Sequence, residues 1–145
     1  MKRMLLALGA ISTTVVAGCA STQITPAAQV GSGEICIVDN PNDRQAFRDA
    51  YERTIRAKGY KPRIVNDAKA CQVITTYSSR LGYDGWGAYL ADADLQVFNG
   101  DKLMGQAKYH APPGLASHGS VEGKIAALVD QMLPPSVELK GPASQ

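Results

Sequence analysis

The sequence predicts an α+β domain: a mainly antiparallel sheet of about five strands with two helices on one face. Three observations lead to this prediction. Apolar residues recur at helical spacing in two segments, 39–62 and 120–133, near the two ends of the domain. Short runs rich in β-branched residues lie between and before them. A longer stretch, 88–111, alternates apolar and polar residues around Asn99-Gly100 and indicates a hairpin. The expected order is β-α-β-β-β-β-α.

The first strand is expected at Glu34–Val38, which reads EICIV, and the first helix follows it. Asn40 or Asn42 can cap that helix, Pro41 suits its first turn, and Gly59 supplies its end. The inward face is expected to comprise Phe47, Ala50, Tyr51, Thr54 and Ile55.

Two further strands are expected at 61–65 and 71–79, followed by the hairpin. A two-residue turn at Asn99-Gly100 mixes apolar and charged side chains on each face. A three-residue loop, 99–101, sorts the faces better and is favoured, because a slip of one residue exchanges the two faces. This register places Gly100 in a left-handed conformation and predicts a cross-strand pair between Asp92 and Lys108.

The last helix is expected to bury Val121, Ile125, Leu128, Val129 and Met132. Ser117 or Ser120 can cap it, and Pro134-Pro135 ends it. Because both helices lie on one face of the sheet, the opposite face is left to water or to a partner.

The N-terminus has the layout of a secretory signal. Lys2 and Arg3 precede an apolar run of about fifteen residues, shorter than the roughly 20 that a spanning helix needs. Residues 16–19, VAGC, resemble the bacterial lipobox, and the alternative is an ordinary signal peptide with a chance cysteine. The resemblance implies that residues 1–18 are removed and that Cys19 carries a diacylglycerol and an N-linked acyl chain such as palmitate. Since Ala20 is not an aspartate, it also implies an outer-membrane anchor.

Without residues 1–18 the chain has 13 Lys plus Arg and 13 Asp plus Glu, so it is formally neutral. The basicity of the whole chain therefore belongs to the signal and gives no reason to expect a nucleic-acid partner. Residues 19–33 are small and polar and are expected to form a flexible tether between the lipid and a single domain at 34–134. Residues 135–145 are expected to be a disordered tail.

With Cys19 lipidated, Cys36 and Cys71 remain as an even pair in an oxidising compartment. A disulfide between them is expected, closing a loop of about 35 residues. Two free buried thiols and a metal pair are the alternatives.

No sequence motif of a hydrolase, metalloprotease or nucleotide-binding enzyme is present. Asp92 and Asp94 share a strand face and are expected to be solvated, because no histidine converges on them by sequence. His110 and His118 are too few for a zinc site. The protein is therefore expected to be no enzyme and to hold neither metal nor cofactor.

The segment 78–89, SSRLGYDGWGAY, is the candidate binding site, with Arg80, Tyr83, Trp86 and Tyr89 interleaved with glycines. Aromatic side chains on such a connection can stack on sugars or clamp a peptide. The alternative is that Trp86 closes one end of the core.

The pattern ICIVDNP, ITTY, YLADADLQVF and MGQAKYHAPPG, followed by an amphipathic helix, resembles a family of small proteobacterial outer-membrane lipoproteins of unknown function. The resemblance implies an α+β periplasmic domain and supplies no catalytic residues. We expect a lipid-anchored, non-catalytic envelope protein that contacts a protein or an envelope polymer such as peptidoglycan. A small-ligand or glycan-binding module using Tyr83, Trp86 and Tyr89 is the alternative.

Overall fold

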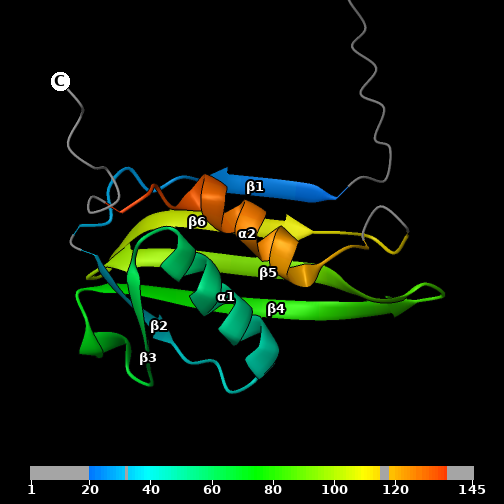
Figure 1. The fold of residues 1–145 in the computed structure, drawn as a ribbon, viewed down its shortest axis with the longest axis horizontal. Coiled ribbons are helices and arrows are strands. Elements are labelled where there is room, and N and C mark those ends of the chain that lie inside the picture. The colour runs from blue at the N-terminus through cyan, green and yellow to red at the C-terminus, as the bar shows by residue number, and fades with distance from the viewer. Residues whose placement is uncertain (1–19, 32, 115–117, 137–145) are drawn as a thin grey trace, which may run out of the picture.

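The computed structural model describes residues 20–31, 33–114 and 118–136. They form one six-stranded sheet, in the order β1-β6-β5-β4-β2-β3, with both helices on one face (Figure 1). The elements are β1 (Ser21–Thr25), β2 (Glu34–Val38), α1 (Gln45–Ala57), β3 (Lys61–Val65), η1 (Ala68–Ala70), β4 (Val73–Asp84), β5 (Gly87–Asn99), β6 (Lys102–His110) and α2 (Val121–Met132). The predicted α+β class is confirmed.

The sheet is mixed. The pairs β1–β6, β6–β5 and β5–β4 are antiparallel, so most of the sheet is antiparallel as predicted, whereas β2 pairs in parallel with both β3 and β4. The parallel β2–β3 pair follows from the helix between them, because α1 carries the chain back to the starting edge of the sheet.

The sixth strand, β1, lies in the segment expected to be a flexible tether, and that expectation is wrong for Ser21–Thr25. β1 pairs along the edge of β6, and Ile24 packs against the core. Beyond it Ala27 is buried and donates its N–H to the carbonyl of Met132 at 2.9 Å. One inward apolar residue in an edge strand leaves no periodicity to detect, so pairing with β6 decides the structure here.

Both helices bury the expected faces. All five residues predicted for the inward face of α1 are buried, as are Ile125, Leu128, Val129 and Met132 of α2, while Val121 is partly buried. Ser120 caps α2 by accepting the N–H of Gly123 at 3.0 Å. The expected asparagine cap of α1 is wrong: Arg44 stands at the N-cap without a side-chain bond, and Asn40 instead accepts the N–H of Asn42 in the preceding loop.

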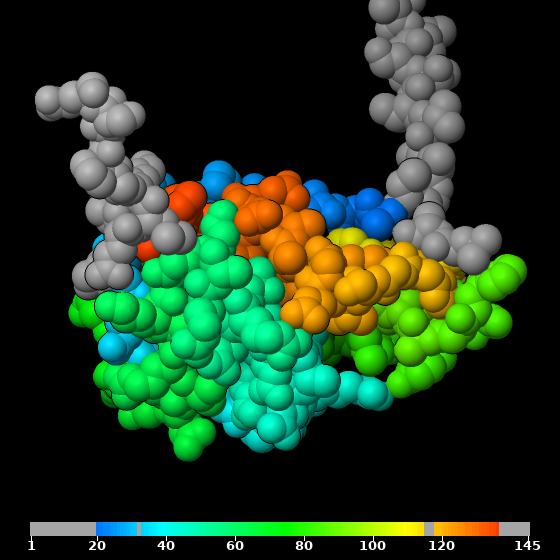
Figure 2. All heavy atoms as spheres, in the orientation of Figure 1, coloured from blue at the N-terminus to red at the C-terminus, as the bar shows by residue number. Residues whose placement is uncertain are grey.

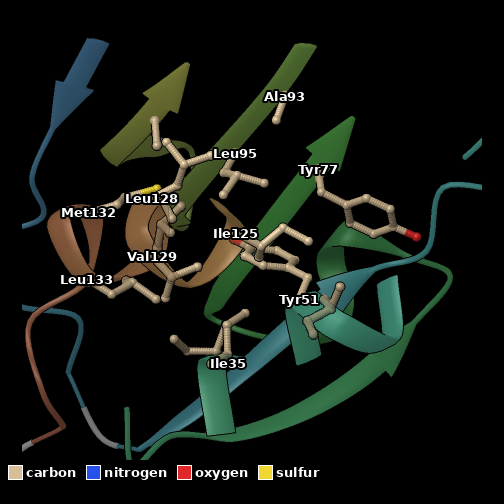
Figure 3. Packing of buried hydrophobic residues seen from close by; sticks show 14 of the residues in the cluster. Ile35, Tyr51, Tyr77, Ala93, Leu95, Ile125, Leu128, Val129, Met132 and Leu133 are labelled. Carbon is tan, nitrogen blue, oxygen red and sulfur yellow. The ribbon is translucent and has the colours of Figure 1, made fainter. Parts of the chain in front are cut away.

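The core lies between the two helices and the central strands (Figure 3). Ile125 and Leu128 of α2 and Tyr51 of α1 meet Leu95 and Tyr77 from the sheet. Tyr51 is fully buried, and its hydroxyl group is bonded to that of Thr75 at 2.6 Å. Burial raises the pKa of Tyr51 far above its ordinary value, so this phenol stays neutral.

The β5–β6 hairpin keeps Ala93, Leu95, Val97 and Ala107 on the predicted buried face, but it does not have the predicted register. Leu103, expected on that face opposite Val97, instead pairs with Phe98 and is exposed. Asn99 pairs with Lys102 around a two-residue turn, and the register shifts between Val97 and Phe98. Gly100 has a φ of +59°, as expected for its left-handed position. The combined effect moves the pairing by two residues, so the expected Asp92–Lys108 pair is wrong and Lys108 lies opposite Asp94.

The start of the segment expected to be a disordered tail is packed. Ser136 is buried, and its N–H donates to the carbonyl of Lys58 at 3.0 Å. Residues 137–145 lie outside the described residues. So do residues 1–19, including the expected signal and Cys19.

Candidate functional site

The sheet face opposite the helices, called here the open face, carries polar side chains in cross-strand rows over β1, β6, β5 and β4. One row is Ser21, His110, Asp92 and Arg80, and the next is Gln23, Lys108, Asp94 and Ser78. These rows exist because alternate residues of each strand point to the same face. The helices cover the other face, which is the one seen in Figure 2.

Asp92 is the centre of the first row. Its carboxylate contacts Nδ1 of His110 at 2.5 Å and forms an ion pair with Arg80. The hydrogen bond from His110, followed by that from Arg80, lowers the pKa of Asp92, while partial burial opposes the shift. The carboxylate is therefore held ionised between the guanidinium group of Arg80 and the ring of His110 on the neighbouring strands.

Asp94 organises the second row. It lies 3.9 Å from the ammonium group of Lys108 and accepts a hydrogen bond from Gln106 at 3.0 Å. The prediction that Asp92 and Asp94 lie on a polar sheet face is confirmed. The expectation that no histidine reaches them is wrong, because the shifted register places His110 opposite Asp92.

A shallow hollow of about 440 Å³ lies over these rows, lined among others by Ser21, Ser78, Arg80, Asp92 and His110. Ser21, His110 and Asp92 are the residue types of a nucleophile, a base and an orienting acid. Their surroundings differ from those of such a site: the side chain of His110 is 60 % exposed, that of Asp92 is 37 % exposed, and Arg80 pairs with the same carboxylate. The row is therefore a partly exposed network of polar and charged side chains in which His110 and Arg80 share one carboxylate.

The candidate binding residues of segment 78–89 are separated in space. This segment is the β4–β5 hairpin, and its end, residues 83–87, projects beyond the rest of the sheet (Figure 1). Tyr83 and Trp86 are 65 % and 67 % exposed there. Tyr89 is buried over Gly82, and Arg80 belongs to the open face. The three aromatic side chains therefore form no shared platform, and the alternative position of Trp86 in the core is wrong.

Asp84 fixes the hairpin end. Its carboxylate accepts hydrogen bonds from the backbone N–H groups of Trp86 at 2.8 Å and Gly114 at 3.1 Å. Nε2 of His118 is hydrogen-bonded to the same carboxylate at 2.9 Å. The Trp86 N–H contributes most to lowering the pKa of Asp84, His118 and Gly114 add to it, and burial opposes it. The ring of His118 also lies 5.5 Å from that of Tyr89. Sequence reasoning missed this site because Asp84 and His118 are joined only by the fold.

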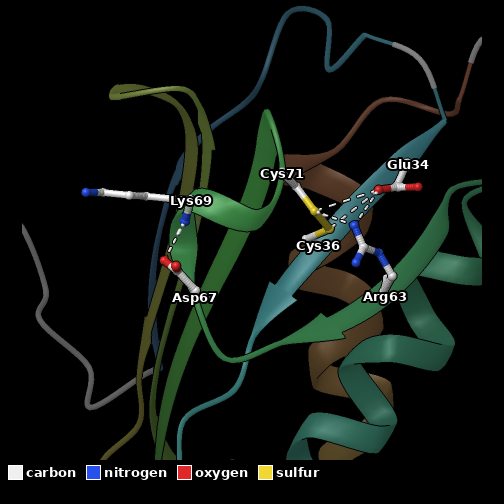
Figure 4. Close-up of a disulfide and its surroundings, with 6 residues drawn as sticks. All are labelled: Glu34, Cys36, Arg63, Asp67, Lys69 and Cys71. Carbon is white, nitrogen blue, oxygen red and sulfur yellow. Dashed lines mark hydrogen bonds and ion pairs between the residues drawn. A yellow bond between two sulfur atoms is a disulfide. The ribbon is translucent and has the colours of Figure 1, made fainter.

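Cys36 and Cys71 form a disulfide, as predicted (Figure 4). It sits beside an apolar patch of Val65, Ile74 and Phe98 on the β2–β4 side of the open face. Arg63 lies beside it, bonded to Glu34 at 3.2 Å. Glu34, Cys36 and Cys71 are the only group of three possible metal ligands in the part of the chain that the structure describes, and the two cysteines are joined to each other.

Comparison with protein-family models and with curated proteins finds no match for this chain. Within the described ranges, no helix has the length and apolar character needed to cross a bilayer.

Proposed function

We propose that this protein is a lipid-anchored cell-envelope protein that works without catalysis, by binding an envelope protein or polymer through its open face. The lipobox-like VAGC sequence supports an anchor at Cys19 and a place in the outer membrane, facing the periplasm. Membership of the small proteobacterial lipoprotein family named above is part of the same proposal.

The observation that carries the binding proposal is the open face itself. Four strands present it without a covering helix, and its charged side chains are already placed by cross-strand pairs. A rigid surface of alternating charge loses little side-chain entropy on binding and selects a partner of complementary charge. A small-ligand or glycan-binding function of the aromatic segment has less support, because Tyr89 is buried away from Tyr83 and Trp86.

In-cell crosslinking tests the partner. A photo-crosslinking residue at Gln23, on the open face, is compared with one at Arg56 on the exposed side of α1. We expect a reproducible adduct from position 23 alone, and digestion with a muramidase separates a peptidoglycan adduct from a protein adduct. Equal adducts from both positions, or none from position 23, would overturn the proposal.

A charge swap tests the role of the face without breaking the internal pair. The double variant Asp94→Lys/Lys108→Asp keeps opposite charges across β5 and β6 and reverses the pattern seen by a partner. We expect an unchanged unfolding midpoint and a loss of most of the adduct from position 23.

A serine-reactive fluorophosphonate probe tests the non-catalytic part. We expect no labelling of Ser21. Labelling of Ser21 that disappears in His110→Ala would contradict the proposal, because it would show that the row activates a nucleophile.

A further inference from the structure

The hairpin end formed by residues 83–87 carries two exposed aromatic side chains. Among the described residues, the large hydrophobic side chains that are exposed are those of Tyr83, Trp86 and Leu103. Leu103 lies beside the β5–β6 turn, at the opposite end of the sheet. A single exposed apolar residue needs no explanation. Two aromatic rings at one projecting point are a specific feature.

The hairpin end and the start of β1 lie at the same end of the molecule (Figure 1). Ser21 of β1 lies in the same cross-strand row as Arg80 of β4, and His110 and Asp92 stand between them. β6 runs toward the hairpin end, and β1 is antiparallel to it, so the chain that enters Ser21 comes from that end of the sheet.

Covalent geometry limits how far Cys19 can be from this surface. Two residues reach at most about 7 Å, so a lipid on Cys19 keeps Ser21 close to the headgroups. Trp86 lies in the turn after Asp84, about 15 Å beyond Arg80 along the strand and about 12 Å across from β1. A bilayer that holds Cys19 is therefore within reach of the hairpin end. A flexible tether of fifteen residues would instead let the domain sit away from the bilayer.

Two hydrogen bonds hold the hairpin end in its observed conformation. Asp84 holds the backbone at Trp86, and Arg44 donates a hydrogen bond to the hydroxyl group of Tyr83 at 2.8 Å. The side chains of Tyr83 and Trp86 nevertheless remain exposed. Figure 2 shows the hairpin end, in yellow-green, projecting past the helices.

The chemistry of the two side chains fits a lipid surface. Tryptophan and tyrosine favour the membrane–water interface, because each has an apolar ring and a polar group that stays hydrated. Arg44 adds a positive charge beside Tyr83, which suits anionic headgroups. Two rings bind a membrane weakly by themselves, and an anchor a short distance away raises their effective concentration.

We propose that Tyr83 and Trp86 insert at the headgroup level of the membrane that holds the acylated Cys19. This inference rests on the lipid anchor of the proposed function. The protein then has two contacts with the bilayer, which fix its orientation and direct the open face to one side.

Trp86 reports on the contact directly, because it is the only tryptophan in the chain. The lipidated protein, purified from membranes, is placed in vesicles of phosphatidylethanolamine and phosphatidylglycerol, with part of the lipid brominated near the headgroup or deep in the chain. We expect a blue-shifted emission and stronger quenching by the shallow bromines. Emission unchanged from detergent-free, unlipidated protein, with no quenching, would overturn the inference.

A matched variant moves the reporter to the other end of the sheet. Trp86→Tyr/Leu103→Trp keeps an aromatic ring at the hairpin end and places the tryptophan at the exposed Leu103 position. We expect no quenching in this variant, and equal quenching at both positions would contradict the proposed orientation. Tyr83→Ser is expected to reduce the quenching of Trp86 by about half or more.

Two further measurements distinguish a protein that is not acylated at Cys19 from one whose Trp86 does not contact the bilayer. Mass spectrometry of the N-terminal peptide shows whether Cys19 is acylated in the cell, which tests the proposed function. The chain from Cys19 onward, coupled through the Cys19 thiol to a maleimide lipid, tests the Trp86 contact whatever that result is. Quenching there supports the inference, and its absence overturns it.

Discussion

The carboxylate of Asp84 holds the β4–β5 turn against the loop before α2. It accepts the N–H groups of Trp86 and Gly114 and a ring nitrogen of His118, so one side chain joins the β4–β5 turn to the loop before α2. These donors favour the ionised form and lower its pKa. Asp84 therefore links the position of Trp86 to the protonation of a single group.

The pKa shift of Asp84 predicts an acid-sensitive stability. Its folded pKa lies below the ordinary value, so the unfolded chain binds the proton more readily and the free energy of unfolding falls as the pH drops below about 4. Asp84→Asn is expected to lower stability at neutral pH and to reduce this acid dependence, measured by urea unfolding across the pH range. Asp101→Asn removes an exposed turn carboxylate as a control, and an equal effect of both variants would contradict the prediction.

At the scale of elements, close backbone approaches determine how the edges of the sheet pack. Gly82 lies directly under the ring of Tyr89, and a Cβ atom there would overlap the ring. Gly105 lies under the chain that follows β1, where a Cβ atom would come within 3.0 Å of Ala27. Both positions need glycine for space, and neither has a positive φ.

Gly82→Ala is expected to lower the free energy of unfolding by about 1–3 kcal/mol, the usual cost of overpacking. The added methyl group must displace the buried Tyr89 and disturb its contact with His118. Gly85→Ala, in the same hairpin and with open space at its Cβ position, is the control. Thermal unfolding of the two variants compares them, and a Gly82→Ala variant as stable as Gly85→Ala would refute the steric argument.

Gly105→Ala is expected to loosen β1 and the segment up to Val30, because Ala27 must move away from β6. The measurement is amide hydrogen exchange, with a loss of protection of roughly tenfold confined to residues 21–30, or about 1.4 kcal/mol of local opening. Gly123→Ala in α2, where the added Cβ makes only ordinary contacts, controls for the intrinsic effect of removing a glycine. Unchanged protection in Gly105→Ala would show that the segment is held elsewhere.

At the scale of the whole molecule, the disulfide joins β2, which lies between β4 and the edge strand β3, to the loop before β4. Cys36 is fully buried, and the closed loop contains all of α1 and β3. A bridge of this span restricts the unfolded chain strongly, which matters in a domain of this size.

Cys36→Ala/Cys71→Ala is expected to lose about 2–4 kcal/mol of stability in urea unfolding. Reductant should destabilise the wild-type protein by a similar amount and leave the double variant unchanged. A double variant as stable as the oxidised wild type would show that the native contacts of β2 and β4 suffice without the bridge.

The parts of the fold that follow from local pattern could be predicted from the sequence. The buried face of α1 follows from helical spacing, and β2 and β3 follow from β-branched runs bounded by turn residues. The cysteine pairing follows from their number once Cys19 is set apart. The buried face of β5 follows from alternation, although the hairpin register does not, because a shift of two residues leaves that face unchanged. The irregularity beside the turn, which places Leu103 opposite Phe98 and leaves it exposed, does not follow from alternation.

Only the tertiary structure decided the features on which the proposed function and the proposed membrane contact depend. β1 exists because β6 offers an unpaired edge, and that pairing places Ser21 at the end of the sheet from which the β4–β5 hairpin projects. His110 meets Asp92, and Asp84 meets His118, through contacts between residues far apart in the chain. Local propensity determines which segments are helices and strands, whereas pairing and packing determine which side chains share a surface, and no local pattern contains that information.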